Sequence, residues 1–84
     1  MIEDPSIYAA YLFAAEIAKP KNPRKALELA QQATAFNPDS IDAWKQVATL
    51  AAQLANRKVL NEAIIRVGDL APGSETLRQV QKLR

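Results

Sequence analysis

The chain has 84 residues, of which 49% are hydrophobic, and a formal net charge of +2 at pH 7. This length allows one small domain, over residues 1–84, whose high surface-to-volume ratio makes its core marginal. The sequence contains no cysteine and no histidine, which excludes a disulfide framework, a thiolate or imidazole metal site, and acid–base catalysis by histidine.

The beginning of the chain lacks the basic region of a signal peptide. No apolar run approaches the ~18 residues that a membrane span requires. We therefore expect a cytoplasmic protein, or a domain of a larger one, with no membrane-spanning helix in this chain.

The first predicted helix covers about residues 5–19. Asp4 can cap it, and Pro5 suits the first helical position because its missing N–H needs no partner there. Pro20 ends the helix. This helix is apolar nearly all round and carries two stripes. One, expected to face the second helix, comprises Ala10, Phe13, Ala14 and Ile17. The other comprises Tyr8, Tyr11, Leu12 and Ala15.

The second predicted helix covers about residues 23–36; Asn22-Pro23 starts it, and Asn37-Pro38 follows its end. Small residues dominate one of its faces, so a neighbouring helix can approach closely. These residues lie at helical spacing: Ala26, Leu27, Ala30 and Ala33.

The third predicted helix reaches about Ala55, and either Asp39 or Ser40 caps its first turn. Its apolar residues in line are Trp44, Val47, Ala48 and Ala51. The residues Asn56-Arg57 are interpreted as a short connection.

The fourth predicted helix covers about 58–70, and Leu60, Ile64 and Val67 lie on one face. Gly68 lies inside this helix and lowers its stability by about 1 kcal/mol relative to alanine, unless the absence of a side chain lets a neighbouring element pack closely there. Ser74 caps a last, mostly polar helix. Five helices joined by short loops predict an all-α fold with antiparallel neighbours.

Two similar turn sequences lie 34 residues apart: "NPDS", which contains Pro38, and "APGS", which contains Pro72. A period of this length is typical of stacked helical hairpins. The period therefore predicts two repeated units followed by a final helix.

The repeated units carry apolar residues at the spacing Trp-x2-Leu-Gly-x2-Tyr, followed by Ala-x3-Phe and Pro. In the second unit these positions are Trp44, Val47, Ala48, Ala51, Leu60, Ile64 and Pro72. In the first they are Ala10, Phe13, Ala14, Ile17, Ala26, Ala30 and Pro38. On these residues the chain resembles the tetratricopeptide repeat family. The departures, at Ala10, Ala30, Ala51 and Leu60, change side-chain volume and keep the apolar pattern.

The resemblance implies antiparallel helical hairpins stacked in a right-handed tetratricopeptide-like array. Repeat one would cover about 7–40, repeat two about 41–74, and a capping helix about 75–84. Another helical-hairpin array and a plain five-helix bundle are the alternative folds.

The family binds peptide segments or helices of other proteins in the groove lined by the first helix of each repeat. The resemblance implies that this groove is lined by Tyr8, Tyr11, Leu12, Ala15, Lys19, Asp42, Lys45, Gln46, Thr49 and Gln79.

Some members of the family clamp a terminal carboxylate with Lys and Asn side chains. Ala15 and Thr49 stand where those Asn residues would be, so a carboxylate clamp is not expected. The expected partner is a protein or peptide, with a second copy of the chain as one candidate.

The second apolar stripe of the first helix has two interpretations. In one, Tyr8 and Leu12 pack against the third helix of a monomer. In the other, the stripe contacts a partner, a second copy or preceding repeats. A rival function follows from the last case, in which the chain is the structural C-terminal end of a longer array, or a tail domain, with no ligand of its own.

Charged residues gather at the two edges of the predicted array. The basic ones are Lys19, Lys21, Arg24, Lys25, Arg57 and Lys58, and the acidic ones opposite are Asp39, Asp42, Asp69 and Glu75. This placement favours solubility and suits the helix dipoles. Nucleic acid is not the expected partner, because the net charge is only +2 and no aromatic residue is interleaved with the basic cluster.

Enzymatic activity is not expected. Ser6, Ser40 and Ser74 lie at or near predicted helix starts, where capping explains them, and no histidine or cysteine can activate or replace them. The only glycines, Gly68 and Gly73, form no phosphate-binding loop. We therefore expect no cofactor and no small-molecule substrate.

Overall fold

The structure, a computed structural model, describes residues 5–84, and the side chains of residues 7–84. Within this range the chain forms five α-helices and no strand, which confirms the predicted all-α class. The helices are α1 (Pro5–Ala18), α2 (Pro23–Phe36), α3 (Ile41–Gln53), α4 (Arg57–Leu70) and α5 (Glu75–Gln81). The predicted cap at Asp4 lies outside the described residues.

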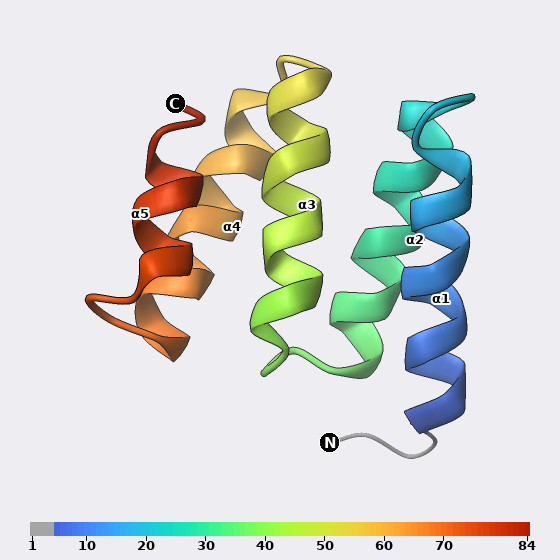
Figure 1. Cartoon of the computed structure of the whole chain (residues 1–84), viewed down its shortest axis with the longest axis horizontal. Helices are drawn as coiled ribbons and strands as arrows, with labels where there is room; N and C mark the ends of the chain where they lie inside the picture. Colours follow the sequence, from blue (N-terminus) through green and yellow to red (C-terminus); the bar gives the residue numbers. More distant parts are fainter. Residues whose placement is uncertain (1–4) are drawn as a thin grey trace.

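The helices form a row in chain order. α1 packs on α2, α2 on α3 and α3 on α4, while α5 contacts both α3 and α4. Each helix runs antiparallel to the next, and α4 lies behind α3 and α5 (Figure 1). The α1–α2 and α3–α4 turns lie at one edge of the row, and the other two turns lie at the opposite edge. Across residues 5–84 no helix is long and apolar enough to cross a membrane.

Polar side chains begin four of the helices and repeat along the chain. The Oδ1 atoms of Asn22 and Asn56 each accept a hydrogen bond from the backbone N–H three residues later, at 3.2 Å. The Oγ atoms of Ser40 and Ser74 do the same at 3.2 and 3.1 Å. The members of each pair are 34 residues apart, as are the first and last residues of α2 and α4. Ser40 is therefore the cap of α3, and Asn56, interpreted as part of a connection, is also a cap.

The third helix ends at Gln53, two residues before the predicted end. Ala55 has a φ of 57°, in the left-handed region. Its N–H donates to the Ala52 carbonyl at 3.1 Å, and the Asn56 N–H donates to the Ala51 carbonyl at 2.8 Å. This is the Schellman pattern of helix termination, in which glycine is the usual left-handed residue. Alanine holds this conformation with some backbone strain.

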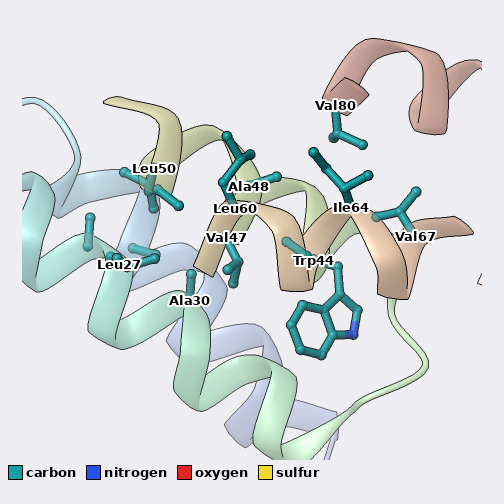
Figure 2. Close-up of a cluster of buried hydrophobic side chains, with 14 residues drawn as sticks. Leu27, Ala30, Trp44, Val47, Ala48, Leu50, Leu60, Ile64, Val67 and Val80 are labelled. Carbon is teal, nitrogen blue, oxygen red and sulfur yellow. The ribbon is translucent and has the colours of Figure 1, made fainter. Parts of the chain in front are cut away.

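The hydrophobic core is centred on α3, which packs against helices on two sides (Figure 2). Its larger members are Leu27, Trp44, Val47, Leu50, Leu60, Ile64, Val67 and Val80. Fully buried alanines from α2, α3 and α4 fill the space between them and let the helix backbones approach closely. The Trp44 Nε1 donates to the Pro38 carbonyl at 2.8 Å, and the Arg66 guanidinium lies 6.0 Å from the Trp44 ring centroid.

The orientation of α1 corrects one expectation from the sequence. Phe13 and Ile17, expected to face α2, are 68% and 58% exposed. α1 instead buries Ala15 completely and stacks the Tyr11 ring on Phe36 of α2, with 5.4 Å between ring centroids. The small Ala15 side chain lets α1 come close to its neighbours, and the stacked ring extends the contact to the end of α2.

Candidate partner-binding groove

A surface groove lies between α1 and α3, with about 390 Å³ of open space. It is lined by Leu12 and Glu16 from α1, by Lys19 just after α1, and by four residues of α3: Asp42, Lys45, Gln46 and Thr49. Leu12, Glu16 and Lys19 are spaced by four and three positions, and Asp42 is three or four positions before Lys45 and Gln46 and seven before Thr49, which places each set on one side of its helix. Six of these seven residues belong to the groove predicted from the sequence, and Glu16 is the addition.

The two walls of the groove are joined by a side-chain hydrogen bond. The Gln46 Nε2 donates to the Glu16 Oε1 at 2.9 Å. Glu16 is not among the groove residues that the sequence predicts. Its place in the groove was detectable in the sequence, because it is four residues after Leu12 and three before Lys19. Thr49, which also lines the groove, donates its hydroxyl to the Lys45 carbonyl at 2.9 Å within α3.

The groove carries two carboxylates, Glu16 and Asp42, and two ammonium groups, Lys19 and Lys45. Its formal charge is therefore balanced. In the described part of the chain, ion pairing is confined to α5, where Arg78 lies 3.4 Å from Glu75. Lys19 and Lys45 thus have no carboxylate partner among residues 7–84. Both ammonium groups are available to a ligand, and Leu12 offers an aliphatic contact in the same groove.

Four residues of the predicted groove lie elsewhere. Ala15 is fully buried and cannot contact a ligand. Tyr11 stacks on Phe36 on the α2 side of α1. The Tyr8 hydroxyl hydrogen-bonds with the Ser40 Oγ, which ties α1 to the start of α3. Gln79 is exposed on α5 and does not line the groove. For the three α1 residues the reason lies in the rotation of this helix, which presents Leu12 and Glu16 to the groove and directs Tyr8, Tyr11 and Ala15 into contacts with the rest of the fold.

The basic residues at the turns also have a defined position. Lys19, Lys21, Arg24 and Lys25 lie at the α1–α2 turn, and Arg57 and Lys58 at the α3–α4 turn. These turns are at the same edge of the row (Figure 1). The edge is therefore basic, but no aromatic side chain lies among these residues in the sequence to stack on a base.

A comparison of the chain with family models, with curated proteins and with solved structures found no match. The groove is therefore interpreted from its own geometry.

Proposed function

We propose that this chain is a protein-interaction module of the tetratricopeptide-like type, which binds a peptide segment or a helix of a partner protein in the groove between α1 and α3. The observation that carries the proposal is the groove itself. It is open, it is formed by the first helices of two successive hairpins, and it presents Lys19 and Lys45 without carboxylate partners from the described residues.

The repeated caps support the tetratricopeptide-like arrangement. Equivalent polar side chains cap helices at 34-residue intervals, at Asn22 and Asn56 and again at Ser40 and Ser74. The order of helix contacts, in which each helix packs on its neighbours along the row, is the order expected of stacked hairpins.

The composition of the groove indicates the kind of segment that it suits. Side chains of both signs line it, so a segment with both acidic and basic residues can match it. An apolar residue in the same segment would cover Leu12. The exposed Gln46–Glu16 hydrogen bond links the two walls before any ligand binds.

A selection from displayed random peptides tests this proposal. We expect enriched peptides whose affinity, measured by fluorescence anisotropy, falls about 10-fold in Leu12→Ala and in Lys45→Ala. This loss corresponds to about 1.4 kcal/mol and is the size expected of the few residues that dominate an interface. Lys58→Ala is the matched control, because it removes the same exposed charge from α4, away from the groove. Circular dichroism would verify that each variant keeps its helicity.

The proposal fails if no peptide is enriched, or if Lys58→Ala weakens binding as much as Lys45→Ala does. Tyr11→Ala is unsuitable as a groove variant, because it removes the stacking contact with Phe36 and would loosen α1 itself.

The rival function is that of a structural end unit in a longer repeat array, without a ligand of its own. The observation that favours it is the exposure of Phe13 and Ile17 on the far side of α1. In such an array a helix of a preceding repeat would cover them. The peptide selection separates the two functions, since an end unit without a ligand would enrich no groove-binding peptide.

A further inference from the structure

The side of α1 that faces away from the fold is apolar and uncovered. We call it the outer stripe, and it consists of Ala9, Phe13 and Ile17, spaced four residues apart on one helical face. All three are exposed, and Phe13 and Ile17 are among the most exposed large hydrophobic side chains of residues 7–84. A contiguous apolar surface of this kind marks an interface more often than a free surface.

The repeated architecture shows how the same face is used elsewhere in the chain. At the 34-residue period, Ala9, Phe13 and Ile17 correspond to three residues of α3 that are all 0% exposed: Ala43, Val47 and Ala51. Val47 belongs to the core cluster that includes Leu27 and Ala30 of α2, and α3 packs directly on α2 (Figure 2). In α3 this face is covered by a helix, so its counterpart in α1 has the shape and chemistry to receive one.

We propose that a second copy of this chain covers the outer stripe, with the two α1 helices packed antiparallel about a twofold axis at Phe13. Ile17 lies four residues after Phe13, and Ala9 lies four residues before it. Antiparallel pairing therefore sets the large Ile17 of each copy over the small Ala9 of the other, which is the self-complementarity that a twofold interface requires. Parallel pairing would oppose Ile17 to Ile17 and leave a gap at Ala9.

The opposite end of the row does not complement the outer stripe. The exposed residues of α5 and of the chain after it are polar or charged: Glu75, Arg78, Gln79, Gln81, Lys82 and Arg84. A head-to-tail contact would therefore press charged side chains against Phe13 and Ile17, at a desolvation cost. The twofold arrangement avoids this contact.

The proposed interface is small. An apolar hollow of about 320 Å³ borders the stripe at Ala10 and extends it toward Leu29 of α2. Even so, one helix pair buries less than the ~1,600 Å² typical of stable complexes. The dimer is therefore weak and dependent on concentration. None of the three stripe residues lines the α1–α3 groove, so the dimer contact is separate from the proposed function and is tested separately.

Sedimentation equilibrium over a wide concentration range tests self-association. We expect the mass to rise from one chain toward two, and Phe13→Glu to raise the dissociation constant at least ~100-fold, because it would bury an unpaired carboxylate at the axis. Ile65→Glu is the control, since Ile65 on α4 is 60% exposed and lies outside the proposed contact. If the measured mass stays that of a single chain at concentrations up to ~1 mM, where even very weak association is detected, the proposal is wrong. The outer stripe would then be covered by a helix other than α1 of a second copy. Equal effects of the two variants would also overturn the proposal.

Cross-linking tests the antiparallel register. The chain has no cysteine, so introduced cysteines react without background. A mixture of Ala9→Cys and Ile17→Cys chains, treated with a mild copper oxidant, is expected to form a disulfide-linked pair containing one of each. Either variant alone should link several times more slowly. Faster linking of Ile17→Cys to itself would show parallel pairing and refute the proposed axis.

Discussion

Gly68→Ala is expected to stabilise the fold by about 1 kcal/mol. Gly68 lies in the interior of α4, where glycine is less favourable than alanine by 0.8–1.0 kcal/mol, roughly, in host peptides. A Cβ atom added there would lie 3.7 Å from the Leu77 Cδ1 and 3.9 Å from its Cδ2. These are ordinary van der Waals distances, so the new methyl group packs between α4 and α5 without displacing Leu77. For a domain of this size the change corresponds to a melting temperature higher by about 4–8 °C.

The matched control makes the same chemical change at the other glycine. Gly73 has a φ of +73°, and nothing lies within 4 Å of an added Cβ. Gly73→Ala is therefore expected to destabilise the fold by about 1 kcal/mol through backbone strain alone. Thermal and urea denaturation followed by far-ultraviolet circular dichroism would measure both. A destabilising Gly68→Ala would refute the reasoning, because it would mean that α5 packs on α4 more tightly than the distances to Leu77 indicate.

Two further predictions concern helix ends. Ala55→Gly is expected to raise the free energy of unfolding by up to about 1 kcal/mol, since it relieves the left-handed strain after α3, and a lower urea midpoint would contradict this. Ser40→Ala and Ser74→Ala should each lose about 1 kcal/mol through loss of a cap. The loss should be larger at Ser40, which also contacts the Tyr8 hydroxyl. Tyr8→Phe removes the Tyr8–Ser40 hydrogen bond alone. Equal losses of unfolding free energy in the two serine variants would show that this hydrogen bond contributes nothing to stability.

The helices were predictable because the sequence marks their ends with residues of known effect. Asn22-Pro23, Pro38 and Ser74 each limit the backbone or cap it locally. The early end of α3 was not predictable. Alanine favours helix, and nothing local distinguishes Ala55 from the alanines before it. Its left-handed conformation depends on the two hydrogen bonds that close α3.

The rotation of α1 was the main error, and its cause is physical. Hydrophobic periodicity selects a buried face only where another face is polar. α1 has apolar residues nearly all round, so Phe13 and Ile17 matched the pattern as well as Tyr11 and Ala15 did. The choice was made by tertiary contacts with Phe36 and Ser40, which are distant in sequence. The groove residues of α3 came from the family resemblance, and Asp42, Lys45 and Gln46 do line the groove.

The position of α1 at the end of the row has a consequence for cooperativity. α1 packs extensively only on α2, whereas α3 is held by helices on two sides. In a linear array each unit is stabilised by its nearest neighbours, so α1 can open locally at a lower free energy than α3. Opening removes Leu12, Glu16 and Lys19, one whole wall of the groove. The affinity of the groove for any ligand then depends on how often α1 is open. A contact that holds α1 in place raises this affinity even where it does not touch the ligand.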